Sequence, residues 1–184
     1  MLCSTEYCAI ELVSYGYDDS PLHGYVKTSA GSSEEVYAPE RIDRNRGVTL
    51  FELDPETCKT KNRQRFDTYA AADNGPSARL LETLESATAG TIIVAVTADT
   101  PEKGDNMSFQ KYVDSFFTRY NMNVTGLLCR DKFSFIMQKG YPQKTVFQRK
   151  ARFGDTLKMK IQLSGKLRTV GLCAYIIVIV NPSF

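Results

Sequence analysis

Short runs in which apolar and polar residues alternate make up most of the chain. In residues 7–15, apolar side chains occupy both alternating sets of positions, which indicates a strand in the interior of a sheet. Residues 91–97 are continuously apolar and β-branched, which predicts a central strand. Weaker patterns predict further strands at residues 22–28, 36–42, 47–53, 63–69, 124–128, 132–138, 144–150, 156–163 and 169–180. The last is almost entirely apolar from residue 170 onward, so we expect it in the middle of the sheet or facing two layers.

Two segments instead have helical spacing. The first follows Asn74-Gly75-Pro76, with Ser77 as its cap, apolar residues at positions 80, 81, 84 and 87, and Gly90 as its stop. The second spans about residues 107–120 and places its large apolar residues on one face, namely Phe109, Tyr112, Val113, Phe116 and Phe117. These patterns predict an α+β fold, with a mostly antiparallel sheet and two main helices packed outside it.

The chain has 184 residues, which suits a single domain. Nothing between residues 140 and 160 resembles a linker, so residues 151–184 are expected to form a hairpin that extends the core. The longest apolar run, Ala174–Val180, is too short to span a membrane. The first residues lack a basic and then apolar leader, which predicts either a mature form or a protein that is not exported by the usual route.

The formal net charge of +2 conceals an asymmetry. Residues 1–129 carry a net charge of −7, and residues 130–184 carry +9. This division suggests an anionic partner or a contact between unlike halves, although a solvated basic face explains it more simply. An anionic polysaccharide would then bind the basic C-terminal strands through Lys144, Arg149, Lys150, Arg152, Lys158 and Lys160. No nucleic-acid partner is expected.

Five cysteines are present, Cys3, Cys8, Cys58, Cys129 and Cys173. None has the close spacing of a structural zinc site. An odd number leaves at least one thiol free or intermolecular if the others are oxidised, and all five could equally be buried thiols. The pairing therefore stays open. Two glycosylation patterns, at Asn106 and Asn123, favour export only weakly.

The sequence offers little for catalysis. The single histidine, His23, lies in a Pro-Leu-His-Gly segment with no nucleophile placed beside it, and a turn or core role is expected. The carboxylate pairs Asp18-Asp19 and Glu34-Glu35 would face opposite sides of a strand. Asp67 is expected to be structural, hydrogen-bonding the adjoining turn while Phe66 points inward. We therefore expect no enzyme activity, no cofactor and no metal.

Several short segments follow one another along the chain in an order that is informative when they are taken as a set. They are Arg46-Gly47 before a strand, Gln64 to Tyr69 (Gln-Arg-Phe-Asp-Thr-Tyr), Gly90 to Asp99, Cys129 to Phe135, and Lys139-Gly140. This set resembles the interleukin-like EMT inducer (ILEI/PANDER) domain family over about residues 22–150. The family includes small secreted cytokine-like proteins, the stem domain of protein O-mannose N-acetylglucosaminyltransferase, and a domain of large cell-surface hyaluronan-processing proteins. The resemblance implies a compact, sheet-rich sandwich with helices outside.

The resemblance also implies a carbohydrate site. In the transferase stem domain the matching positions contact sugar, which points here to Arg46, Asp99 and Arg130. A carboxylate and two guanidinium groups suit a polyhydroxylated ligand. Where the family usually has an aromatic residue before the turn arginine, this chain has Cys129. Stacking on a sugar face would then fall to Phe133, Tyr69 or Tyr141.

Two interpretations of these residues stay open. In the alternative to a ligand site, Asp99 and Arg130 form a salt bridge between two loops, and Arg46 caps carbonyl groups. At the level of function, a carbohydrate-binding domain competes with a secreted cytokine-like protein that binds a receptor. Either would be extracellular, and a lectin would be expected to form a homo-oligomer because single sugar sites bind weakly.

Overall fold

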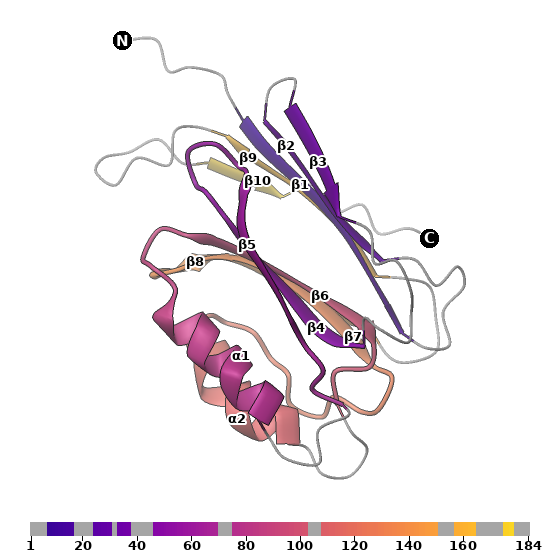
Figure 1. Cartoon of the computed structure of the whole chain (residues 1–184). Coiled ribbons are helices and arrows are strands. Elements are labelled where there is room, and N and C mark those ends of the chain that lie inside the picture. Colours follow the sequence, from indigo (N-terminus) through magenta and orange to yellow (C-terminus); the bar gives the residue numbers. More distant parts are fainter. Residues whose placement is uncertain are drawn as a thin grey trace, which may run out of the picture.

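The computed structural model describes residues 7–16, 24–30, 33–37, 46–69, 75–102, 108–150, 157–164 and 175–178. In these residues ten strands form one continuous sheet folded into two layers, and two helices cover the outer side of one layer (Figure 1). The predicted α+β class, with a sandwich-like sheet and helices outside, is confirmed.

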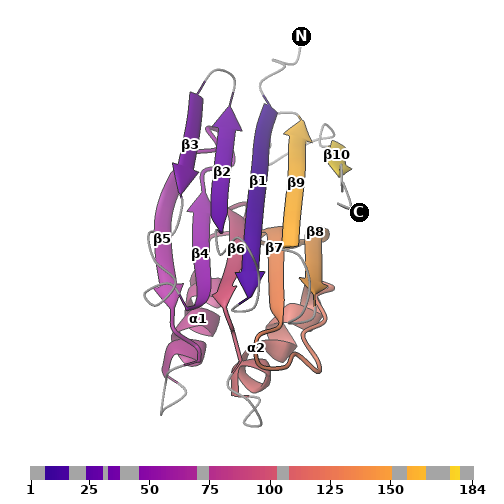
Figure 2. The ribbon, with the colours of Figure 1, turned by 90° about the vertical axis from the view of Figure 1, so that its right-hand side faces the viewer.

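The first layer, layer A, has the strand order β3-β2-β1-β9-β10, with every neighbouring pair antiparallel (Figure 2). Its strands are β1 (Tyr7–Gly16), β2 (Tyr25–Ala30), β3 (Ser33–Tyr37), β9 (Leu157–Ser164) and β10 (Tyr175–Val178). β1 is an interior strand, as predicted. Among the described strands β10 lies at the edge, so the expected place in the middle of the sheet is wrong, while the alternative that it faces two layers stays a prediction. A continuous apolar run indicates two apolar faces, but it does not fix a position in the strand order, and β9 takes the place beside β1.

The second layer, layer B, has the order β5-β4-β6-β7-β8 and is likewise antiparallel. Its strands are β4 (Gly47–Leu53), β5 (Thr60–Phe66), β6 (Ile92–Asp99), β7 (Lys132–Gln138) and β8 (Tyr141–Lys150). β6 is central, as its apolar sequence predicted. The layers are joined where β1 runs parallel to the end of β6, with Tyr15 opposite Ala98 and Gly16 opposite Asp99.

A buried polar cluster holds this junction together. Thr97 exchanges two hydrogen bonds with the backbone of Phe133 through its hydroxyl, which accepts from the N–H and donates to the carbonyl, both at 3.1 Å. The Ser14 hydroxyl accepts from the Thr97 N–H at 2.9 Å and lies 2.6 Å from the Ser134 hydroxyl. Side chains thus satisfy backbone groups where the β6–β7 ladder ends and β1 enters.

The helices α1 (Gly75–Ser86) and α2 (Ser108–Arg119) pack on the outer face of layer B. Their apolar faces meet alternate residues of β7, and Phe133 stacks with Phe109 at a centroid distance of 5.5 Å. Ser77 lies inside the first turn of α1 and is buried, so it does not take the cap position predicted for it. The α1 leucines at positions 80 and 84 are fully buried, as helical spacing requires.

A second core fills the space between the layers. It contains Ile10 and Leu12 from β1, Val94 from β6 and Met159 and Ile161 from β9. A disulfide joins Cys8 of β1 to Cys58 in the turn between β4 and β5, and so crosses from one layer to the other. Cys129 is the free cysteine among the described residues.

Some predicted boundaries were wrong. Residues 124–128 form turns and no strand, because the Asn123 side chain accepts the Thr125 N–H at 2.9 Å and Gly126 has φ of 72°. The strand predicted at 36–42 begins earlier, as β3 at Ser33–Tyr37, and its predicted residues 38–42 lie outside the described part. The strand predicted at 63–69 is β5 at Thr60–Phe66. His23, for which a turn or core role was predicted, lies outside the described residues.

Candidate functional site

One end of layer B gathers the charged residues that the sequence singled out. Because β4 and β6 run antiparallel, the start of β4 lies beside the end of β6, with Gly47 opposite Ala98. The end of β5 and the start of β7 reach the same end, which is the lower one in Figure 2. Arg46, Asp67, Asp99 and Arg130 therefore lie in the four segments that meet there. We call this the strand-end site.

Gly47 lets two of these segments come close together. Its φ of 98° favours glycine, and a Cβ at this position would lie only 2.1 Å from the carbonyl oxygen of Phe66. The Arg46-Gly47 pair thus opens β4 directly against the Phe66–Asp67 corner. This close approach places the Arg46 side chain next to Asp67.

Arg46 and Asp67 form a two-pronged ion pair. Arg46 Nε donates to Asp67 Oδ1 at 3.0 Å, and Nη2 donates to Oδ2 at 3.0 Å. The hydrogen bond to Asp67 raises the pKa of Arg46, and the charges of Asp67 and Asp99 add to the shift against the opposing effect of burial. The guanidinium also lies over the ring of Tyr69, with 5.0 Å between Cζ and the ring centroid.

This geometry bears on two sequence expectations. Asp67 was expected to have a structural role through its own turn, and the partner that the structure adds is Arg46. The alternative in which Arg46 caps carbonyl groups is wrong, because its hydrogen bonds among the described residues all go to the Asp67 carboxylate. The neighbouring Thr68 ties the corner to the loop after β6 by donating to the Pro101 carbonyl at 2.6 Å. Phe66 points into the core beneath the helices, as expected.

Asp99 ends β6 in a left-handed backbone conformation, with φ of 61°. Its carboxylate lies close enough to Arg46 and Tyr15 for its charge to raise the pKa of both. Burial raises the pKa of Tyr15 to about 12, and the charge of Asp99 contributes to that rise. Arg46 and Asp99 therefore come together as the strand-end hypothesis requires.

Arg130 also has a left-handed backbone, with φ of 71°. Its N–H donates to the hydroxyl of Thr100 at 2.8 Å, and that hydroxyl in turn donates to the Glu102 carbonyl at 2.9 Å. Asp131 steadies the same turn by accepting the Leu128 N–H at 2.9 Å. The loop after β6 and the turn before β7 are thereby held against each other.

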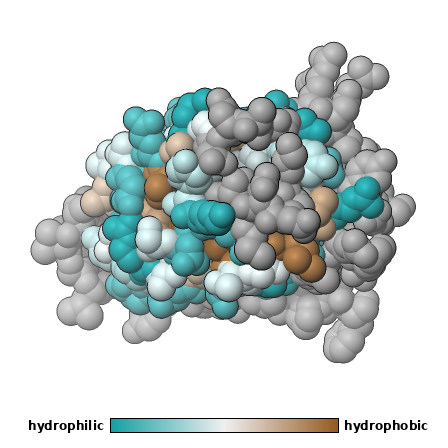
Figure 3. Space-filling model, turned by 90° about the horizontal axis from the view of Figure 1, so that it is seen from below, coloured by the Kyte–Doolittle hydropathy of each residue, from teal (hydrophilic) through white to brown (hydrophobic). Residues whose placement is uncertain are grey.

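The aromatic residues proposed for sugar stacking differ in position and in exposure. Phe133 is fully buried within the stack beneath α2, so the expectation that its ring receives a sugar is wrong. Tyr141 begins β8 opposite Gln138, at the other end of β7 from Arg130. Tyr69 is half-buried at the strand-end site beneath Arg46. Figure 3 looks onto this lower end of the molecule, where hydrophilic side chains predominate among the coloured residues.

The basic residues of the C-terminal half lie on two faces. Lys158 and Lys160 are exposed on the outer side of layer A, because their neighbours Leu157 and Met159 face the core. Arg149 instead lies beside the turn after α2 and donates to the Thr125 carbonyl at 2.7 Å. Lys144 is half-buried and donates to Gln138 at 2.8 Å. The side chains of Lys150 and Arg152 lie outside the described part.

Three further observations bear on function. Within the described residues, no cluster of three or more histidine, cysteine or acidic side chains has the arrangement of a metal site. Neither α1 nor α2 is long and apolar enough to cross a membrane. Arg63 and Arg65 of β5 went unnoticed in the sequence as candidate binding residues, although basic residues at positions 61, 63 and 65 alternate along a predicted strand.

Comparison with known proteins supports the resemblance. No curated protein matches the chain. The family model for the interleukin-like EMT inducer domain matches residues 46–141, from the residue before β4 to the first residue of β8. The match covers just over half of the chain and includes Arg46, Asp99 and Arg130. This chain belongs to the interleukin-like EMT inducer family.

Proposed function

We propose that the protein is a non-catalytic carbohydrate-binding domain that recognises a glycan through Arg46, Asp99 and Arg130. The observation that carries the proposal is the pair of left-handed backbones at Asp99 and Arg130, in two segments joined by the Thr100–Arg130 hydrogen bond. For Arg130 this conformation costs about 1–2 kcal/mol, whereas an aspartate such as Asp99 adopts it more readily. Strain of this kind concentrates at binding sites, where it fixes side chains for a ligand.

Arg46 supports the proposal through its unused donors. Its guanidinium carries five N–H groups, and the bonds to Asp67 use one on Nε and one on Nη2. Among the described residues, both Nη1 hydrogens and the second Nη2 hydrogen remain for a ligand, and the side chain is 32% exposed. Asp67 and Tyr69 hold the group in place, so a sugar hydroxyl would meet donors that are already oriented.

An extracellular location is part of the proposal. The disulfide between Cys8 and Cys58 supports it, because structural disulfides persist mainly in oxidising compartments. Family membership points the same way, since the resemblance described above includes secreted and cell-surface proteins. An extracellular domain would meet glycans on proteins, cells and matrix.

The test is a glycan array with the wild-type protein and two matched variants. Asp99→Asn removes the charge but keeps a residue that tolerates the left-handed backbone. Asp114→Asn makes the same chemical change on the exposed side of α2 and serves as the control. We expect Asp99→Asn to weaken binding at least about tenfold, the loss of one charged hydrogen bond, while Asp114→Asn has no effect.

Urea denaturation of the same proteins separates a ligand site from a structural clamp. Equal unfolding midpoints with lost binding support the proposal. A lower midpoint for Asp99→Asn with unchanged glycan binding would show that Asp99 is only structural. If the wild-type protein binds no glycan, the proposal is wrong, and binding of a protein receptor becomes the better explanation.

A further inference from the structure

A shallow hollow opens between the two layers. β3 and β5 are edge strands on the same side of the molecule in Figure 2. Tyr15, Tyr25 and Tyr37 line the hollow from layer A, and Thr49, Phe51 and Arg63 line it from layer B. Its cavity volume is about 20 Å³, which is room for about one water molecule. A small molecule therefore cannot be enclosed here. A ligand would have to lie across the mouth, as an extended chain does.

Aromatic rings form the walls of this hollow. Tyr37 and Phe51 face each other from the two layers, with ring centroids 5.4 Å apart. Tyr25 and Tyr37 are half-buried, so each keeps part of its ring accessible. The Tyr37 hydroxyl donates to Glu35 at 3.1 Å, which fixes its ring, whereas the Tyr25 hydroxyl bonds Glu11 on the outer face of layer A. Fixed, partly exposed aromatic rings are suited to receiving the apolar face of a sugar ring.

Two cationic side chains stand at the mouth. Arg63 and Arg65 are two residues apart on β5 and share one face of the strand, opposite Phe51 and Thr49 respectively. Both are exposed, and the Arg63 guanidinium lies 5.7 Å from the centroid of the Phe51 ring. Within the described residues neither has a carboxylate partner, whereas Lys61 on the same face is paired with Asp54 at 2.7 Å. An unpaired guanidinium binds a carboxylate or sulfate through two hydrogen bonds.

The hollow leads directly to the strand-end site. Tyr15 and Ala98 both line it and pair with each other where β1 meets β6. The residue after Ala98 is Asp99, and Gly47, opposite Ala98, follows Arg46. A chain-like ligand can therefore contact Arg46 and Asp99 at one point and lie along β5 at the next.

We infer that the glycan recognised at the strand-end site is acidic, and that its carboxylate or sulfate groups bind Arg63 and Arg65 while a neighbouring sugar ring rests on the partly exposed ring of Tyr37. This inference rests on the proposed function and assigns the class of glycan. Charge favours an acidic chain, and the aromatic walls together with the continuity with Arg46 and Asp99 favour a sugar over an acidic peptide.

The experiment compares one acidic oligosaccharide with its neutral counterpart. A chondroitin sulfate hexasaccharide and its desulfated, carboxyl-reduced form are titrated calorimetrically into the full chain at low and at physiological ionic strength. Arg63→Gln/Arg65→Gln is the test variant. Arg79→Gln/Lys111→Gln removes the same two charges from the exposed sides of α1 and α2 and is the matched control.

We expect the wild-type protein to bind the acidic form more tightly than the neutral form. The test variant should bind the acidic form about tenfold more weakly or worse, which corresponds to about 1.4 kcal/mol, and should bind the neutral form unchanged. The control variant should match the wild type. Equal urea midpoints of the two double variants would exclude a folding defect, because all four side chains are exposed.

Each other outcome decides between the two proposals. If the test and control variants bind alike, or if the wild type does not prefer the acidic form, the inference is overturned, while loss of binding in Asp99→Asn still supports the strand-end site. If the test variant loses binding but Asp99→Asn does not, the acidic glycan binds along the hollow at Arg63 and Arg65, and the proposed binding at the strand-end site is wrong. If polyglutamate competes as well as the acidic sugar, the ligand is a peptide and the inference is wrong.

Discussion

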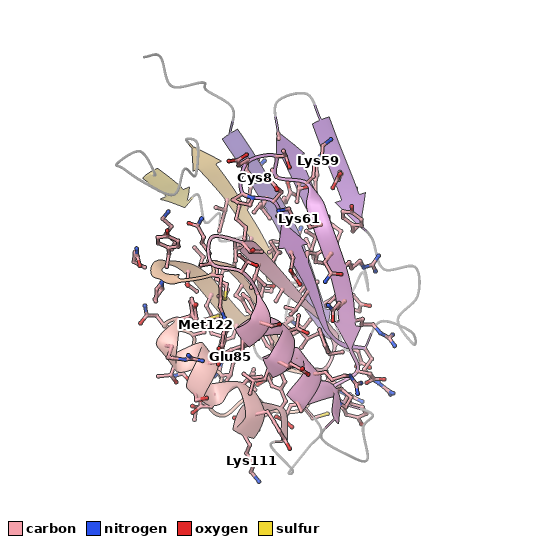
Figure 4. The ribbon with its side chains drawn as sticks, turned by 60° about the vertical axis from the view of Figure 1, so that its left-hand side comes forward. Cys8, Lys59, Lys61, Glu85, Lys111 and Met122 are labelled. Atoms are coloured by element: carbon pink, nitrogen blue, oxygen red, sulfur yellow. A yellow bond between two sulfur atoms is a disulfide. The ribbon has the colours of Figure 1, made fainter. Side chains whose placement is uncertain are left out.

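The disulfide between Cys8 and Cys58 gives the most direct test of how the two layers are held together. Cys8 begins β1 in layer A, and Cys58 lies in the turn between β4 and β5 of layer B. Figure 4 shows Cys8 near Lys59 and Lys61, at the end of the molecule away from the helices. Among the described residues, it is the disulfide that links the layers at this end. Its removal should therefore lower the stability of the whole sandwich.

The size of the effect follows from the separation of the two cysteines. They are 50 residues apart, and closing a loop of that length in the unfolded chain reduces its entropy by the equivalent of about 4 kcal/mol. Both side chains are also almost fully buried, at 7% and 3% exposure, so replacing sulfur by hydrogen leaves small cavities that add to the loss. A domain of this size has a total stability of about 5–15 kcal/mol, so the change is a large fraction of it.

The assay is urea denaturation of Cys8→Ala/Cys58→Ala against wild type under non-reducing conditions. Cys58 has φ of 60°, but alanine has the same Cβ, so the substitution adds no new backbone strain. With a slope of about 2 kcal/mol per molar urea, we expect the midpoint to fall by about 2 M. Cys129→Ser, at the free and half-exposed cysteine, should leave it unchanged. A fall of less than about 0.5 M in the double variant would refute the account of the disulfide as the main constraint.

Two further predictions concern single charged side chains. Lys139 donates to the carbonyls of Leu84 and Glu85 at the end of α1, so Lys139→Met should lower the free energy of unfolding by about 1–2 kcal/mol. Lys111→Met, on the exposed face of α2, should change it little. Both are measured by urea denaturation. The hydrogen bond from Lys61 lowers the pKa of Asp54 to about 2, so the folded state binds fewer protons and gains stability as the pH rises from about 2 to about 4. Asp54→Asn should reduce this gain in thermal unfolding, and an unchanged pH profile would contradict the assignment.

Much of the fold could be predicted because the strands of layer B have distinct patterns. The predicted strands at 47–53 and 132–138 have the observed bounds, and the apolar run at 91–97 correctly gave a central strand. The strand predicted at residues 124–128 was wrong because the alternation there is too short to outweigh an asparagine turn and a left-handed glycine. The edge position of β10 could not be predicted, because strand order depends on contacts between distant segments that no local pattern records.

The candidate site was predictable in part. Strand-end charges converge when strands run antiparallel, so the meeting of Arg46 and Asp99 followed from the topology. The burial of Phe133 could also have been predicted from the sequence, because residues 133, 135 and 137 occupy one face of a strand and are all large and apolar. The pairing of Asp67 with Arg46 could not be predicted from the sequence, because it depends on the close approach of two backbone segments at Gly47. Side-chain pairing across a corner cannot be read from spacing alone.

The two layers contribute differently to the proposed glycan surface. Arg46, Asp99, Arg130 and the two β5 arginines all lie within the span that defines the family, residues 46–141. The tyrosines that form the other wall of the hollow, Tyr15, Tyr25 and Tyr37, come from β1 to β3, outside that span. A hollow between layers exists only when both are present, because each contributes one wall. If the proposed function holds, the preference for a particular glycan would depend on layer A as well as on the strand-end residues, and family membership alone would not determine it.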